Sequence, residues 1–170
     1  MSLAVPYLLD AAARTVPEAD VAVADDHMTV SELDRRSIAA AEALLQKGLQ
    51  TGNRMPLPAM GTAGRLISAL SAIRIGLVLC EDAAPASDRA VGAGADGPVG
   101  GGSRIWSQTP AAIIGSRTVT HGQVIQAVQR GDLRDLEPLR PLLELLGHIW
   151  TAAAAAPSAD PNVGSGHEDR

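Results

Sequence analysis

The sequence predicts an α/β domain in which a small, partly parallel sheet is flanked by helices. First, short apolar runs of strand type alternate with longer segments of helical periodicity, which is the strand–helix–strand order of a parallel sheet. Second, 170 residues with 46% hydrophobic side chains suffice to bury one core. Only 2% of the residues are aromatic and none is Phe, so this core must consist of Ala, Val, Ile and Leu.

The N-terminal segment is predicted to form a helix followed by a strand. Apolar residues recur at helical spacing over residues 5–13, and Pro17 ends this helix. Residues 21–24 read as a short strand, because they alternate Val and Ala. Residues 25–27 then form a turn, after which Met28 leads the chain back.

A second helix is predicted to begin at Thr29, because Thr29 and Glu32 have the spacing of a capping box. Gly48 ends this helix, as a glycine in the left-handed conformation commonly does. The side chains expected to face the core are Leu33, Ala40, Ala41, Leu44 and Leu45.

The next elements predict a parallel strand–helix–strand unit. Residues 55–58 form a strand at the edge of the sheet or a distorted one, because its two prolines cannot donate to a neighbouring strand. Thr62 is expected to cap the following helix and Gly76 to end it. Residues 77–80 then form a buried strand, which carries the lone Cys80 as a buried thiol.

The composition changes at residue 81 and divides the chain into four parts. Residues 1–80 form the N-terminal α/β part, and residues 81–103, rich in Ala, Gly, Asp and Pro, are predicted to be a disordered linker. Residues 104–156 hold a strand and helices, the last from Pro141 to about Ala155. The broad apolar side of this last helix packs in the core or contacts another chain. Residues 157–170 form a disordered tail.

Charge and hydropathy exclude several classes of protein. The net charge of -5 and the lack of a basic stripe argue against a nucleic-acid partner. No apolar stretch reaches the ~18 residues of a membrane span, and no secretory signal is visible, so a cytoplasmic protein is expected. The acidic residues between 132 and 144 alternate with Leu and Arg as on a solvated helix face, and no metal site is predicted. His148 is expected to be a partly buried structural histidine.

The stretch 111–123 carries the candidate site. An apolar strand meets a small, hydroxyl-rich turn, and Thr-His-Gly then opens a helix, an order that places an anion at a helix N-terminus. A nucleophilic Ser–His pair lacks a third group to orient the histidine, so no catalytic residue is assigned. In the alternative, structural interpretation Thr120 caps the helix and His121 packs or is solvated. The candidate ligand-binding residues are Ser116, Arg117, Thr118, Thr120 and His121.

Five segments in order resemble the N-terminal part of the acyl-adenylate-forming ligases, which include fatty-acyl-AMP ligases, acyl-CoA synthetases and the adenylation domains of peptide synthetases. They are residues 29–33 (TVSEL), 48–54 (GLQTGNR), 72–76 (AIRIG), 111–114 (AAII) and 120–124 (THGQV). This resemblance implies the N-terminal subdomain fold of that AMP-binding superfamily.

The chain also departs from the pattern of that family. The family has a Ser/Thr/Gly-rich phosphate loop with a Lys between the AAII strand and the Thr-His pair, and here only residues 115–119 stand there. The only Lys, Lys47, belongs to a distant helix. Because adenylation needs the charge of the triphosphate to be held in place, ligase activity of this chain on its own is not expected. No cofactor is expected, and ATP, AMP and Mg²⁺ would bind only if ancestral binding survives.

Function is therefore expected to lie in association. The chain is interpreted as a truncated, non-catalytic pseudoenzyme related to acyl-activating ligases of bacterial fatty-acid or secondary-metabolite biosynthesis. Its expected partner is a second copy, a full-length ligase or a carrier protein. The alternatives are a nucleotide- or acyl-binding module, a ligase subunit completed in trans, and a gene fragment that folds poorly.

Overall fold

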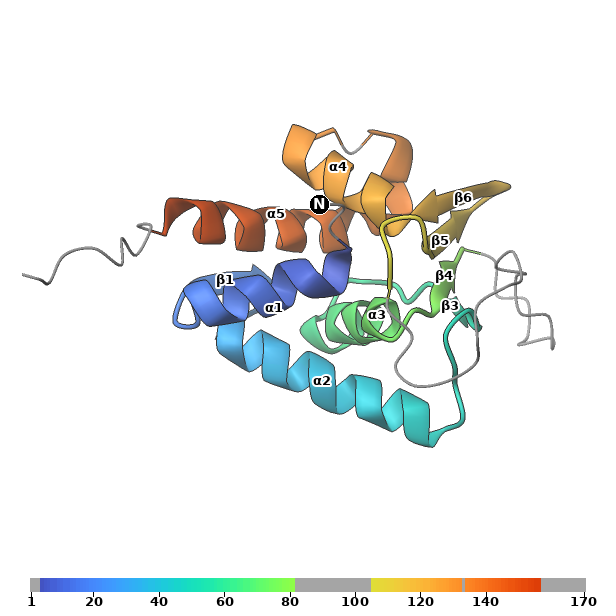
Figure 1. Cartoon of the computed structure of the whole chain (residues 1–170), viewed down its shortest axis with the longest axis horizontal. Helices are drawn as coiled ribbons and strands as arrows, with labels where there is room; N and C mark the ends of the chain where they lie inside the picture. Colours follow the sequence, from blue (N-terminus) through green and yellow to red (C-terminus); the bar gives the residue numbers. More distant parts are fainter. Residues whose placement is uncertain (1–3, 82–104, 133, 157–170) are drawn as a thin grey trace, which may run out of the picture.

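The computed structural model describes residues 4–81, 105–132 and 134–156, in which helices pack beside a four-stranded and a two-stranded sheet (Figure 1). The α/β prediction is confirmed. Of the linker predicted over 81–103, residues 82–103 lie outside the described residues, and so does the predicted tail over 157–170. In chain order the elements are α1 (Val5–Thr15), β1 (Asp20–Val23), β2 (Asp26–Thr29), α2 (Val30–Gln46), β3 (Arg54–Pro56), α3 (Ala63–Arg74), β4 (Val78–Cys80), β5 (Pro110–Ile114), β6 (Arg117–Thr120), α4 (His121–Arg130), the 3-10 helix η1 (Arg134–Leu139) and α5 (Arg140–Ala155).

The larger sheet has the strand order β3-β4-β5-β6 and is parallel except at its last pair. The strand–helix–strand unit β3-α3-β4 is the predicted one, and β3 lies at the predicted edge. The chain then turns back from β5 to β6 through a two-residue turn, Gly115 and Ser116, because Ile114 pairs with Arg117. Residues 117–120, which the sequence interpretation placed in a turn, therefore form an antiparallel strand.

The smaller sheet corrects a second prediction. Val23 pairs with Asp26, so the turn consists of Ala24 and Asp25 and not of residues 25–27. Ala24 adopts a left-handed φ of 57°, which permits this tight reversal. His27 consequently lies in strand β2, exposed, with its Nδ1 3.0 Å from Oδ2 of Asp20.

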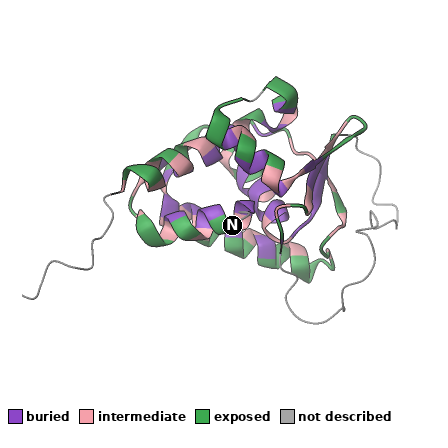
Figure 2. Ribbon diagram, turned by 45° about the horizontal axis from the view of Figure 1, so that its top comes forward, coloured by how far each residue is buried: buried purple, intermediate pink, exposed green. Residues whose placement is uncertain are grey.

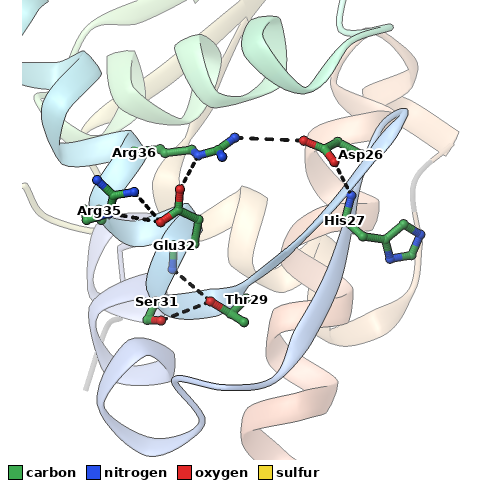
Figure 3. A network of polar contacts seen from close by, with 7 residues as sticks. All are labelled: Asp26, His27, Thr29, Ser31, Glu32, Arg35 and Arg36. Atoms are coloured by element: carbon green, nitrogen blue, oxygen red, sulfur yellow. Dashed lines mark hydrogen bonds and ion pairs between the residues drawn. The ribbon is translucent and has the colours of Figure 1, made fainter.

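The predicted capping box of α2 is formed only in half (Figure 3). The Glu32 N–H donates to Oγ1 of Thr29 at 3.2 Å, as expected. The Glu32 carboxylate, however, accepts from Arg35 and Arg36 and does not reach back to Thr29. Two guanidinium groups three and four residues on compete for this carboxylate, and their hydrogen bonds lower the pKa of Glu32.

Helix α3 is capped by a residue distant in the sequence. The hydroxyl of Thr62, at the predicted N-cap, makes no capping bond. Instead Oδ1 of Asp25, in the β1–β2 turn, accepts from the Ala63 N–H at 3.0 Å. This contact ties the small sheet to the start of α3.

The Asp25 cap predicts that substitution of Asp25 destabilises the chain more than substitution of Thr62. We expect Asp25→Ala to lower the free energy of unfolding by about 1 kcal/mol, the usual cost of losing a side-chain cap. Thr62→Ala, at the position the sequence favours, should change it by less than about 0.5 kcal/mol. Urea unfolding measures both, with Asp25→Asn as the control that keeps an acceptor oxygen. An equal or larger loss in Thr62→Ala would contradict the assignment.

The core lies between α1, α3, α4, α5 and the inner sides of the strands (Figure 2). Of the two alternatives for α5, the described structure takes the first, because its apolar side is buried against α1 and α4. On α2 only a narrow stripe is buried, so the predicted core residue Leu45 is 51% exposed. His148 is exposed as well, on the outer side of α5, and not partly buried. The buried residues of α5 are Leu142, Leu143, Leu145, Leu146 and Ile149.

An ion cluster joins three helices. Arg74, in the last turn of α3, is only 13% exposed, and its guanidinium contacts the carboxylates of Asp10 on α1 and Asp34 on α2. It also donates to Oγ of Ser37 at 3.0 Å. Burial raises the pKa of Asp34, and Arg74 opposes that rise.

No helix of the described segments is both long and apolar enough to cross a bilayer.

Candidate functional site

The five candidate residues extend from the β5–β6 turn along β6 to the first residue of α4, and they do not converge on a point. Ser116 is at the exposed tip of the β5–β6 hairpin, and Thr120 is at the other end of β6. At about 3.3 Å per residue, these two are about 13 Å apart along the strand. Arg117 and Thr118 are exposed on β6, and the Arg117 guanidinium lies 3.6 Å from Oδ2 of Asp135. His121 is the first residue of α4.

The predicted cap of α4 is confirmed, and every donor of its first turn has a partner within the chain. Thr120 and Gln123 form a complete capping box. The remaining two donors bind backbone oxygens of the segment before β5. A phosphate at a helix N-terminus needs free N–H groups, and this turn offers none from residue 120 to 123. The four bonds are Thr120 N–H to Gln123 Oε1 (3.0 Å), His121 N–H to Thr109 O (3.0 Å), Gly122 N–H to Ser107 O (2.7 Å) and Gln123 N–H to Thr120 Oγ1 (3.3 Å).

Gly122 permits this close approach. A Cβ atom at Gly122 would lie 3.0 Å from the carbonyl oxygen of Ser107 and 3.2 Å from its Cβ, closer than ordinary contacts. A larger residue at this position would therefore force residues 107–109 to shift away from the first turn of α4.

This close contact predicts that a glycine-to-alanine substitution has opposite effects on stability at Gly122 and at Gly147. We expect Gly122→Ala to lower the free energy of unfolding by about 1–2 kcal/mol, because the 107–109 segment must move. Gly147→Ala on α5, where nothing lies within 4 Å of the added Cβ, should raise it by up to about 1 kcal/mol through helix propensity. Thermal unfolding of the two variants provides the comparison. Stabilisation by both changes would show that the 107–109 contact is loose.

His121 is completely buried, and neither ring nitrogen has a hydrogen-bond partner in the described structure. Burial lowers the pKa of His121 to about 4, so its ring is neutral at pH 7. The sequence left open whether this side chain packs or is solvated, and the structure buries it. In this arrangement the ring is shielded from solvent and makes no hydrogen bond to the other candidate residues.

Glu81, which the sequence interpretation placed in the linker, contacts the β5–β6 hairpin of the candidate site. Its N–H donates to the carbonyl oxygen of Ile113 at 3.2 Å, which extends the β4–β5 pairing by one bond. Its Oε2 accepts from the Gly115 N–H at 3.1 Å. A carboxylate of the chain thus occupies a backbone donor at the hairpin tip, and its charge disfavours a second anion there. Only its position directly after a buried strand could have indicated this role.

The hairpin itself had a sequence signal. Residues 110–114 are apolar, residues 118–120 are β-branched, and the short segment between them begins with Gly115, a pattern typical of a tight hairpin. Within the described ranges, no three His, Cys, Asp or Glu side chains come together as a possible metal site.

Comparison with known proteins supports the fold and leaves the activity open. No protein-family model and no curated protein match the sequence. Among solved structures, the chain is similar to VinN, an adenylation enzyme, with 17% identity, a TM-score of 0.62, and coverage of 89% of this chain and 58% of VinN. VinN in complex with L-aspartate gives a TM-score of 0.61 at 17% identity, covering 89% of this chain and 61% of that chain.

A more limited similarity exists to the N-terminal domain of FACL13 from Mycobacterium tuberculosis. There the identity is 21% and the TM-score 0.40, covering 45% of this chain and 20% of that domain. The chain thus spans about a fifth of the FACL13 domain and about three fifths of VinN. The likeness to VinN confirms, at the level of the fold, the resemblance that the sequence segments predicted.

Proposed function

We propose that this chain is a non-catalytic relative of the acyl-adenylate-forming ligases and acts by binding another protein. The partner is a second copy of the chain, a full-length ligase or a carrier protein. The setting is the cytoplasm of a bacterium and the biosynthesis of fatty acids or secondary metabolites.

One observation carries the non-catalytic part of this proposal. The stretch that would hold a phosphate consists of a two-residue turn, the four-residue strand β6 and the N-terminus of α4. The backbone N–H groups at this N-terminus already bind within the chain. Charge on a transferring phosphoryl group must be stabilised by several preorganised donors and cations. Here a single guanidinium, that of Arg117, is exposed beside Asp135, and the ring of His121 is buried.

The exposure of aromatic side chains supports association. The chain has two Trp and one Tyr, and Trp106 and Tyr7 are 62% and 43% exposed. Trp106 lies in a turn that two hydrogen bonds hold. Its backbone N–H donates to Thr109 Oγ1, and its carbonyl oxygen accepts from the Thr109 N–H, both at 3.0 Å. Exposed aromatic residues on rigid backbone are typical of the centres of protein interfaces.

Sedimentation velocity tests the association. We expect the purified chain either to exceed its monomer mass of 17.5 kDa or to form a complex with a ligase or carrier protein of its source organism. Trp106→Ser should weaken that association at least about tenfold. Gln129→Ser, an exposed change on α4, is the matched control and should leave it unchanged. A monomer that binds neither protein contradicts the proposal.

A second candidate is a ligase subunit completed in trans, and the similarity to VinN over 89% of this chain supports it. Pyrophosphate exchange distinguishes this candidate from the first. Exchange that appears only when a co-purifying partner is added supports completion in trans. The same complex without exchange supports a purely structural role.

A further inference from the structure

His121 stands apart from the other buried polar side chains of the described residues. Ser37 and Ser71 are also fully buried, but each donates its hydroxyl to a backbone carbonyl, Ser37 to Asp34 at 2.8 Å and Ser71 to Ile67 at 2.6 Å. His121 has two ring nitrogens and a partner for neither. A proton on this ring would therefore be a charge in an apolar site without a hydrogen bond to stabilise it.

The position of His121 makes a proton still less favourable. It is the first residue of α4, where the helix dipole is positive and repels a cation. The elements packed against α4 are α1, β5, β6 and α5, and none of their charged side chains forms an ion pair with His121. The charged and titratable residues of α4 and these elements are Tyr7, Asp10, Arg14, Arg117, Arg130, Arg140, Glu144 and His148.

The backbone of the same residue links the helix to the segment before β5. The His121 N–H donates to Thr109 O, and the next N–H, that of Gly122, donates to Ser107 O. Displacement of the ring toward solvent would pull on both bonds.

We propose that His121 is a proton-sensitive latch: its neutral ring holds the first turn of α4 against residues 107–109, and its protonation releases that turn. The proton comes from solvent when the turn opens, and no other group is consumed. This inference is independent of the proposed association.

The sign and the size of the effect follow from proton linkage. Burial lowers the pKa of His121 from its ordinary value of 6.5 to about 4. Above pH 6.5 both the closed and the open turn carry a neutral ring, and the latch is at full strength. As the pH falls from 6.5 toward 4, the open turn binds a proton that the closed turn rejects. The opening equilibrium should then rise about tenfold per pH unit and about 300-fold in all.

Hydrogen exchange of the full chain, corrected for intrinsic rates, tests the latch. Between pH 7 and pH 4.5 we expect peptides covering 105–132 to lose protection, while peptides from α3 and β4 keep theirs. His121→Gln and His121→Leu, which cannot titrate, should remove this difference, and His148→Gln on exposed α5 should retain it. Equal acid-induced loss in the wild type and in the His121 variants would overturn the proposal.

A second readout does not depend on any variant. In an NMR titration of the wild-type chain, the His121 ring should remain neutral while the fold is intact down to about pH 5. A ring that takes up a proton near pH 6.5 without loss of protection in residues 105–132 would overturn the latch.

Discussion

Arg74→Met should destabilise the chain by about 3 kcal/mol, because it leaves two carboxylates without their shared cation. Asp10 and Asp34 come from different helices and both contact the Arg74 guanidinium, whose side chain is 13% exposed. Methionine keeps most of the apolar stem of arginine, so the loss reports on charge and hydrogen bonding. Chemical unfolding at pH 7 measures it.

Two further variants make the Arg74 experiment specific. Arg36→Met removes an arginine that pairs with Glu32 at the exposed surface, and it should cost less than about 1 kcal/mol. Arg74→Met combined with Asp34→Asn should recover part of the loss, since it removes a carboxylate that burial already disfavours. Equal losses in Arg74→Met and Arg36→Met would show that the cluster does not join the three helices.

Leu146→Ala on α5 should lower the free energy of unfolding by about 3–5 kcal/mol and the melting temperature by roughly 10 °C. Leu146 is completely buried, in the cluster that also contains residues of α1 and α4. Leu45→Ala on α2 makes the same chemical change at a side chain that is 51% exposed, and it should cost less than about 1 kcal/mol.

The Leu146 variant separates the two interpretations of α5. A helix whose apolar side served another chain would lose association and keep the stability of its monomer. A helix that closes the core loses stability at every protein concentration. Unfolding measured at two concentrations, about tenfold apart, distinguishes these outcomes.

Local signals in the sequence predicted much of the fold. The unit β3-α3-β4 was predicted from periodicity and from Gly76, which takes a φ of +76°. The cap of α4 was predicted from Thr120, a hydroxyl residue directly before the helical pattern, and its partner Gln123 lies only three positions further along the chain. Such features depend on neighbours within one helical turn or one strand.

The incorrect predictions involve partners distant in the sequence or competition between neighbours. Asp25 caps α3 across 38 residues, and Glu81 contacts Gly115 across 34. No periodicity reports such contacts. Glu32 had the spacing for a capping box, but two nearby arginines bind its carboxylate. For the candidate site, the sequence interpretation identified strand β5 and the cap of α4 but not strand β6, along which Ser116 and Thr120 lie apart.

The binding of nucleotide to the purified chain tests whether residues 111–123 have lost the ability to hold a phosphate. Isothermal titration with AMP, and with ATP and Mg²⁺, covers the nucleotides that the resemblance to the acyl-adenylate-forming ligases implies. We expect no saturable heat up to about 1 mM of each, because the N–H groups of the first turn of α4 and of Gly115 bind within the chain. Saturable binding of AMP or ATP that Arg117→Ala abolishes would contradict it.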